Sequence, residues 1–175
     1  MTTRASYTSN ILLIGYMGSG KTTFGKKLAR VIGYRFLDMD QYIEKKVGRS
    51  IPELFEADGE GVFRTLETEA LGEVVKESGQ VIATGGGMPC FNDNVKLMNA
   101  NGQTVYLELT PEALVSRLRQ AKEVRPLVHG KDESELRAFI SQHLASREKY
   151  YKQATLIYPG LNPDAEALAA ALKNG

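Results

Sequence analysis

Residues 15–22 read GYMGSGKT, and this stretch decides the fold class of the chain. Gly15 and Gly20 are separated by four residues and are followed by Lys21 and Thr22. An apolar run at 11–14 precedes the stretch, and a helix-period segment at 20–32 begins within it. Glycines let such a loop wrap around a phosphate with its backbone N–H groups pointing inward, and the helix N-terminus adds partial positive charge. The stretch therefore predicts a strand, a phosphate-binding loop and a helix in an α/β nucleotide-binding fold.

Each position of this phosphate-binding loop has an expected task. Lys21 is expected to reach the β- and γ-phosphates of a nucleotide, and the Thr22 hydroxyl to ligate Mg²⁺. The neighbouring residues complete the expected ATP-binding set: Gly18, Ser19, Gly20 and Thr23. GTPases and other ATPases share the pattern, so it indicates a nucleotide and not yet a kinase. A D-x-x-G match at 58–61 has no N-K-x-D guanine motif after it, and we interpret it as chance.

Short apolar runs alternate with longer helix-period segments along the chain. The runs expected to be strands are 11–14, 35–37, 80–83, 103–109 and 154–158. The expected helices are 20–32, 50–57, 61–78, 91–99, 111–120, 134–153 and 163–173. The residues expected to form the buried stripe of the 61–78 helix are Val62, Leu66, Ala70 and Val74. Strands that alternate with helices predict a parallel sheet covered on both faces.

Size and composition are those of one globular domain. The chain has 175 residues, of which 42% are hydrophobic and 25% charged, and its net charge is +1. The charges are mixed along the chain, so neither a basic stripe for nucleic acid nor a membrane segment is expected. The single cysteine, Cys90, excludes an intrachain disulfide and fits a reducing compartment. We expect one cytoplasmic, monomeric domain over residues 1–175, with 1–9 as a flexible tail.

Two acids close the second expected strand, in the sequence Leu37-Asp38-Met39-Asp40. Period-two alternation along this strand predicts both carboxylates on the same side, with Met39 opposite. The carboxyl ends of parallel strands share one edge of the sheet with the phosphate-binding loop, so both acids would face one cleft. The alternative is that either acid only caps the following helix.

Three further features are ambiguous when taken one at a time. Arg64 lies off the expected stripe and three residues before Glu67, which by itself favours a surface ion pair. The glycines Gly85, Gly86 and Gly87 follow a short strand and allow a ligand to approach the backbone, although a plain tight turn explains them equally well. Arg147 lies on a long polar helix, which favours a solvated position. The segment 120–134 has few apolar positions, and we interpret it as a mobile surface loop.

Taken in order, the motifs resemble those of the shikimate kinase family. The resemblance spans residues 11–163, and its motifs are GYMGSGKT at 15–22, DMD at 38–40, Phe63-Arg64-x-x-Glu67, GGG at 85–87, RPL at 125–127 and Arg147-x-x-Tyr150. It implies a three-layer α/β/α P-loop kinase fold of the nucleoside monophosphate kinase type, with a five-stranded parallel sheet in the order 2-3-1-4-5. It also implies a substrate-binding region near 39–67 and a mobile lid over 120–133.

The resemblance implies ATP and shikimate as substrates and Mg²⁺ as cofactor. Arg64 and Arg147 would hold the shikimate carboxylate, because the guanidinium fork matches carboxylate geometry. Asp40 and the backbone of residues 85–87 would hold the hydroxyls, and Asp40 would accept the proton of the attacking one. Asp38 would fix Mg²⁺ through a water molecule.

The resemblance assigns the nucleotide side as well. Arg125 in the lid would act with Lys21 and Mg²⁺ to balance the charge on the transferring phosphoryl group, so the expected catalytic groups are Lys21, Asp40 and Arg125. Either Arg117 or Arg119 would contact adenine, and Arg117 aligns better. The segment Asn162-Pro163 would contact adenine from the other side.

Two rival functions stay open. Another small-molecule kinase of the same fold, such as a gluconate or nucleoside monophosphate kinase, would share Lys21, Thr22 and the lid arginine but bind a different acceptor. A regulatory protein that binds ATP without transferring phosphate would leave Asp40, Arg64 and Arg147 unexplained.

Overall fold

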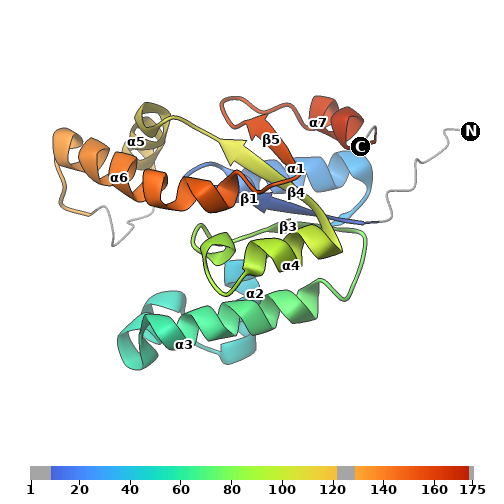
Figure 1. Ribbon diagram of the computed structural model, residues 1–175, viewed down its shortest axis with the longest axis horizontal. Coiled ribbons are helices and arrows are strands. Elements are labelled where there is room, and N and C mark those ends of the chain that lie inside the picture. Colours follow the sequence, from blue (N-terminus) through green and yellow to red (C-terminus); the bar gives the residue numbers. More distant parts are fainter. Residues whose placement is uncertain (1–8, 122–128, 174–175) are drawn as a thin grey trace, which may run out of the picture.

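A five-stranded parallel sheet forms the centre of the molecule (Figure 1). The computed structural model describes residues 9–121 and 129–173. The strands are β1 (Asn10–Ile14), β2 (Arg35–Asp38), β3 (Gln80–Ala83), β4 (Gly102–Glu108) and β5 (Leu156–Pro159). Their order is β2-β3-β1-β4-β5, and every pairing is parallel. The predicted fold class and strand order are confirmed.

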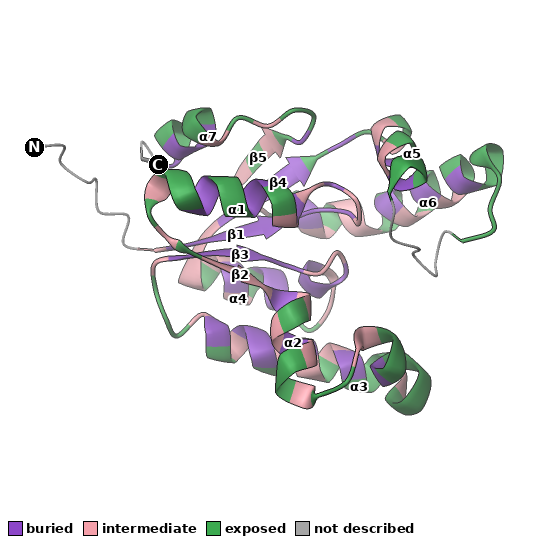
Figure 2. Cartoon of the chain, turned by 180° about the vertical axis from the view of Figure 1, so that it is seen from behind, coloured by how far each residue is buried: buried purple, intermediate pink, exposed green. Residues whose placement is uncertain are grey.

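Helices cover both faces of this sheet. In the described residues they are α1 (Lys21–Ile32), α2 (Met39–Val47), α3 (Ile51–Val74), the 3₁₀ helix η1 (Met88–Cys90), α4 (Asn94–Asn101), α5 (Pro111–Gln120), α6 (Glu133–Tyr151) and α7 (Ala165–Lys173). Figures 1 and 2, seen from opposite sides, show α1 and α7 over one face and α4 and α6 over the other. Helices α2 and α3 pack together beside the sheet.

The central strand β1 shows why both faces need helices. Leu12 and Ile14 belong to the core cluster that includes α3, α4 and α6, whereas Ile11 and Leu13 belong to the cluster that includes α1 and α7. All four side chains are at most 1% exposed. Successive side chains of a strand point to opposite faces, so a continuous apolar run is what a strand covered on both sides requires. Figure 2 shows this burial along the whole strand.

Helix α3 contains both helices expected at 50–57 and 61–78, which meet at a kink. At Gly59 φ is 81° and ψ is 171°, which are not helical angles, so the predicted break between the two helices is confirmed. Glycine adopts this positive φ without a Cβ clash, so the chain can bend there. The expected stripe is partly wrong, because Val62 is 47% exposed. The large ring of Phe63 takes the core position instead, and the buried residues that follow it are Glu67, Ala70, Leu71 and Val74.

Two predicted helix starts are confirmed by their caps. The Ser50 hydroxyl accepts from the backbone N of Glu53 at 3.4 Å, and the Glu53 carboxylate accepts from the backbone N of Ser50 at 2.7 Å. Thr110 caps α5 by accepting from Ala113 N at 3.3 Å. Among the described residues, no helix is both long and apolar enough to cross a membrane. Residues 1–8 of the expected tail and 122–128 of the expected lid lie outside the described residues.

Candidate active site

A cavity of about 690 Å³ opens at the carboxyl edge of the sheet. Its walls come from the phosphate-binding loop, the starts of α2 and α3, the loop after β3 and the end of α5. Parallel α/β sheets bind their ligands at this edge, because the loops that follow the strands meet there. Most of the expected site residues in the described part of the chain line or border this cavity.

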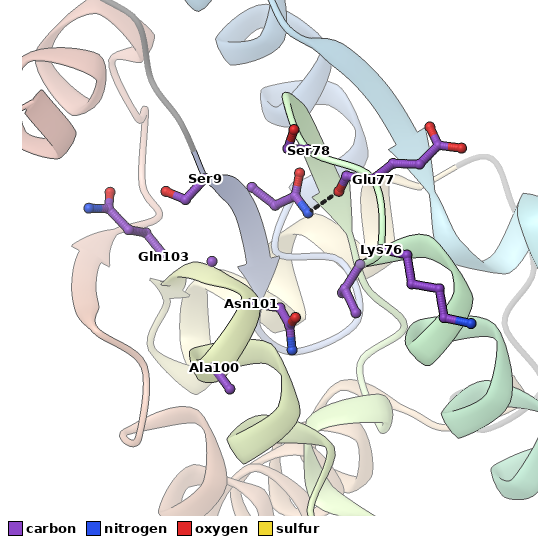
Figure 3. Close-up of a pocket in the computed structure, with 10 residues that line it drawn as sticks. Ser9, Lys76, Glu77, Ser78, Ala100, Asn101 and Gln103 are labelled. Atoms are coloured by element: carbon purple, nitrogen blue, oxygen red, sulfur yellow. Dashed lines mark hydrogen bonds between the residues drawn. The ribbon is translucent and has the colours of Figure 1, made fainter.

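A second hollow, of about 350 Å³, lies at the opposite, amino-terminal edge of the sheet (Figure 3). There the Asn10 side chain donates to the carbonyl oxygen of Glu77 at 2.6 Å and accepts from the backbone N of Gln80 at 3.1 Å. These bonds join β1 to the turn before β3 and to the first residue of β3. None of the expected site residues lines this hollow, so we assign it to the framework of the sheet.

The phosphate-binding loop has the conformation that its sequence predicts. Gly18 and Gly20 have φ values of 78° and 89°, a region that favours glycine. A Cβ atom on Gly18 would also lie 2.9 Å from Leu118 Cδ2, and one on Gly20 would lie 3.1 Å from Arg117 Nη1. Both glycines are therefore required by backbone angle and by space. Gly20 is the N-cap of α1, so the positive end of the helix dipole lies at the loop.

The ammonium group of Lys21 lies inside the loop. Its Nζ donates to the carbonyl oxygens of Gly15 at 2.7 Å and Tyr16 at 2.9 Å, and the residue is only 8% exposed. An ammonium group is a compact point charge with three donors, which suits it to phosphate oxygens. Positive charge is thus concentrated where the loop surrounds a phosphate.

Asp38 and Asp40 do not lie on one strand, so the predicted strand alternation through Asp40 is wrong. Strand β2 ends at Asp38, and α2 begins at Met39. The Asp38 Oδ1 atom caps α2, because it accepts from the backbone N atoms of Asp40 at 3.0 Å and Gln41 at 3.3 Å. A side-chain oxygen at this position satisfies N–H groups that the helix start leaves without partners, so Asp38 does cap the helix, but with one of its two oxygens and not as its sole role. Both carboxylates still line the cavity.

The second oxygen of Asp38 faces the phosphate-binding loop. Its Oδ2 accepts from Thr22 Oγ1 at 2.7 Å. Hydroxyl and carboxylate oxygens are ligands that Mg²⁺ accepts, and Mg²⁺ usually keeps water and substrate phosphates as its other ligands. The described residues hold no cluster of three or more His, Cys, Asp or Glu side chains that could bind a metal alone. The Thr22–Asp38 pair therefore fits an ion shared with a nucleotide.

The glycine loop after β3 brings the two expected carboxylate-binding arginines together. A Cβ atom on Gly87 would lie 2.6 Å from Arg64 Nη1, and one on Gly86 would lie 3.4 Å from Arg147 Nη1. Two guanidinium groups from distant helices thus flank neighbouring residues of one loop. The loop therefore does more than turn the chain, because its lack of side chains makes room for both cations.

Asp40 and Glu67 lie beside the first residue of the same loop. A Cβ atom on Gly85 would lie 3.0 Å from Asp40 Oδ1 and 3.2 Å from Glu67 Oε1. Two acids and two arginines, Arg64 and Arg147, therefore surround three consecutive glycines. Such a site gathers carboxylate acceptors and guanidinium donors around one short loop.

The side chain of Arg64 is largely buried, with 12% of it exposed. Its Nη1 donates to Glu67 Oε2 at 2.6 Å, and its Cζ lies 4.1 Å from the ring centre of Phe91 and 5.4 Å from that of Phe63. The ion pair expected from the sequence exists, but aromatic rings and Gly87 hold the guanidinium away from the surface. Arg64 is therefore fixed in direction, as a carboxylate-binding group must be.

Glu67 is the site residue that the sequence reasoning missed as a functional group. It is 1% exposed, and this burial raises the pKa of its carboxyl group to about 7, with the charge of Asp40 adding to the rise and that of Arg64 opposing it. The detectable signal was its register, because a charged residue three positions after Arg64 falls on the buried side of α3 together with Ala70 and Val74. Charged side chains occupy such positions only with a partner.

Arg147 is half-buried, so the expectation of a solvated position is not met. Its Cζ lies 6.0 Å from the ring centre of Tyr16, a residue of the phosphate-binding loop. The Tyr16 hydroxyl shares a hydrogen bond of 2.8 Å with Nδ1 of His143, one turn earlier on α6. The helix that carries Arg147 is thus tied directly to the phosphate-binding loop.

The structure separates the two candidate adenine-side arginines. Arg117 lines the cavity, and it donates to the carbonyl oxygens of Ser19 at 2.8 Å and Gly160 at 3.0 Å. Arg119 instead pairs with Glu133 on the surface. Gly160 begins the segment that leads to Asn162-Pro163, so Arg117 joins that segment to the phosphate-binding loop. Arg125 lies outside the described residues.

A model of one protein family matches residues 17–172, and its description is shikimate kinase. The chain belongs to the shikimate kinase family. A shikimate kinase from Bacteroides fragilis is 50% identical over 148 residues, which cover 85% of this chain and 83% of the relative. A shikimate kinase from Moorella thermoacetica is 38% identical over 164 residues, which cover 94% of this chain and 92% of the relative.

Solved structures of shikimate kinases have the same fold as this chain. The enzyme from Bacteroides thetaiotaomicron aligns with a TM-score of 0.89 at 43% identity, covering 96% of this chain and 98% of that one. A shikimate kinase from Acinetobacter baumannii in complex with shikimate aligns with a TM-score of 0.81 at 36% identity, covering 93% and 89%. A gluconokinase from Sinorhizobium meliloti has a TM-score of 0.55 at 16% identity, with 94% and 89% covered, and shares the fold alone.

Proposed function

We propose that this chain transfers the γ-phosphoryl group of ATP to the 3-hydroxyl of shikimate, giving shikimate 3-phosphate and ADP. The observation that carries the proposal is the arrangement around Gly85, Gly86 and Gly87, where Asp40, Arg64 and Arg147 converge beside the phosphate-binding loop. Shikimate is a small ring with one carboxylate and three hydroxyls. Two arginines at one end and an acid at the other match that distribution of groups.

Arg64 and Arg147 bind the acceptor carboxylate, and Asp40 binds the hydroxyl that attacks. A guanidinium group can hold a carboxylate through two parallel hydrogen bonds, which fix the direction of the ring. Fixing the carboxylate orients the ring, so that its 3-hydroxyl can be directed toward the phosphate-binding loop. Backbone groups of the glycine loop lie close enough to contribute further hydrogen bonds, because no side chain covers them.

The nucleotide lies along the phosphate-binding loop. Backbone N–H groups of residues 18–23 and the Lys21 ammonium bind its phosphates, and Arg117 with the segment Asn162-Pro163 lies on the adenine side. Thr22 and Asp38 would hold Mg²⁺ beside the nucleotide phosphates. When bound, Mg²⁺ would neutralise charge on the β- and γ-phosphate oxygens.

Transfer needs little covalent chemistry from the protein. The acceptor oxygen forms a bond to the γ-phosphorus, the bond from that phosphorus to the β,γ-bridging oxygen breaks, and ADP leaves. Asp40 orients the hydroxyl and takes up its proton. Lys21 stabilises the charge on the phosphoryl group in transit, and Arg125 is proposed from the sequence to do the same.

An ADP-release assay with a panel of acceptors tests this function. With ATP and Mg²⁺, shikimate should support turnover at least about 100-fold faster than gluconate, AMP or CMP, a ratio that directional hydrogen bonds to a substrate can supply. Turnover with gluconate or a nucleotide and not with shikimate would favour the rival kinases. ATP binding without acceptor-dependent ADP release would favour a regulatory protein.

A further inference from the structure

The guanidinium group of Arg64 is bonded to two carboxylates of its own helix. Nη1 donates to Glu67 Oε2 at 2.6 Å, while Nη2 and Nε donate to Glu60 Oε1 at 3.0 and 3.2 Å. Three of the five N–H groups of the guanidinium therefore already serve carboxylates. The Nε–Nη2 edge can hold a carboxylate through two parallel bonds, so a ligand that binds at this edge has to displace Glu60.

The two partners differ in how easily they can leave. Glu67 is 1% exposed, so separating it from Arg64 would leave a buried carboxyl group without this hydrogen-bond partner. The Glu60 side chain is 56% exposed, so water can solvate its carboxylate as soon as the bond breaks. It also directly follows Gly59, the residue at which α3 kinks. The Nε and Nη2 edge, held by Glu60, is therefore the edge that an incoming ligand can take.

The charges in the site also favour displacement of Glu60. The site gathers two cations, Arg64 and Arg147, and the carboxyl groups of Asp40, Glu60 and Glu67. Asp40 and Glu60 alone balance the two arginines, so an anionic acceptor meets no net positive charge, and moving Glu60 into solvent makes the site more favourable for an anion.

We propose that Glu60 is a specificity residue that occupies the carboxylate site of Arg64 and is displaced by the acceptor's own carboxylate. This inference rests on the proposed function, because it takes Arg64 as the group that binds the acceptor carboxylate. Glu60 keeps the arginine directed and neutralised until an anionic acceptor takes its place. An acceptor without a carboxylate cannot complete this exchange.

Calorimetry tests the proposal. It measures the affinities of the parent and of Glu60→Gln for shikimate and for the uncharged methyl ester of shikimate. The variant should bind shikimate about two- to fivefold more tightly, the range expected for an exposed pair of this kind, and should bind the ester no more tightly than the parent does. Glu56→Gln removes the same charge four positions earlier in the chain and is the matched control for general electrostatics. It should change shikimate binding by less than the Glu60 variant does.

A loss of shikimate affinity in Glu60→Gln, instead of the expected gain, would overturn the proposal. If Glu60→Gln binds shikimate more weakly, Glu60 positions Arg64 and does not compete for it. Equal affinities of Glu60→Gln and the parent, or an equal gain from Glu56→Gln, would also reject displacement. The proposed function is tested separately, on the parent protein alone. If the parent neither binds shikimate nor releases ADP in its presence, the proposed function is wrong, whatever the variants do.

Discussion

The guanidinium group of Arg64 fills the space that a side chain on residue 87 would need. A Cβ atom on Gly87 would lie 2.6 Å from Nη1 and 2.7 Å from Nη2. The backbone of Gly87, with φ of −86° and ψ of −19°, is open to any residue, so the glycine is needed for space alone. The position of the arginine thus depends on an absent side chain in another loop.

Gly87→Ala should therefore impair acceptor binding while the protein still folds. The methyl group displaces the Arg64 guanidinium, and we expect KM for shikimate to rise about tenfold or more, since small displacements of positioning groups are costly. Steady-state kinetics measures this, and thermal unfolding checks the fold. Gly72→Ala is the control, because a Cβ atom there meets nothing within 4 Å, and alanine should stabilise helix α3 by about 0.5–1 kcal/mol. If both variants keep the parental KM, Arg64 is not held at Gly87 for acceptor binding.

Removing either arginine should weaken acceptor binding without affecting the nucleotide. Arg64→Ala and Arg147→Ala each remove a charge-assisted hydrogen bond to the carboxylate, worth about 2–3 kcal/mol. We expect KM for shikimate to rise accordingly and the Kd of ATP to stay near its parental value. A variant whose KM stays within about twofold of the parent identifies an arginine with a structural role only.

The two acids should fail in different ways when each is changed to asparagine. Asp38→Asn keeps the cap of α2, because asparagine is as good an N-cap as aspartate, but removes the charge next to Thr22. The variant should fold normally and need more Mg²⁺ for half-maximal activity. Asp40→Asn should leave the Mg²⁺ dependence unchanged and lower transfer. Measuring the activity of both variants as a function of Mg²⁺ concentration tests this prediction. Indistinguishable Mg²⁺ dependences would contradict this division of roles.

The buried carboxyl group of Glu67 should make stability depend on pH. Burial raises its pKa from 4.5 to about 7, so between these values the folded chain keeps a proton that the unfolded chain has released. The contribution of Glu67 to the free energy of unfolding is therefore full below pH 4.5 and is lost as pH rises to 7, with a slope of at most about 1.4 kcal/mol per pH unit. Glu67→Gln should lack this contribution.

Urea unfolding of the parent and of Glu67→Gln across this pH range measures the effect. The parent-minus-variant difference should fall as pH rises toward 7 and then level off. Glu56→Gln, which changes an exposed carboxylate, should show no such trend. A constant difference at all pH values would show that Glu67 is ionised throughout.

Local patterns predicted the strands and the phosphate-binding loop well, because their causes are local. A continuous apolar run such as 11–14 must be covered on both faces, and the glycines of 15–22 specify backbone angles directly. The acids were harder to place. Asp38-Met39-Asp40 fits the end of a strand and the start of a helix equally well, and only the cap that Asp38 makes decides between them.

Sequence patterns alone could not predict which distant segments of the chain meet in the site. The contacts of Arg64 with Gly87, of Arg147 with Gly86 and of Arg117 with the carbonyl oxygen of Ser19 join residues far apart in the chain. Hydrophobic periodicity gives no information on contacts between residues far apart in the chain. The resemblance to a family is what placed Arg64 and Arg147 in one site. The ion pair between Arg64 and Glu60 is local in sequence, yet its importance could not be predicted. An i, i+4 pair on a helix is ordinarily a surface feature without a functional role.

The pairing of the acceptor carboxylate with Arg64 is tested most directly by a cycle of four measurements of kcat/KM. They combine the parent and Arg64→Ala with shikimate and its methyl ester. If the carboxylate binds Arg64, the parent should prefer shikimate strongly, and Arg64→Ala should lower that preference by about 30- to 100-fold, because the share of Arg64 is gone while Arg147 still binds the carboxylate. If Arg64→Ala prefers shikimate over the ester as strongly as the parent does, the carboxylate binds elsewhere and the assignment of this site is wrong.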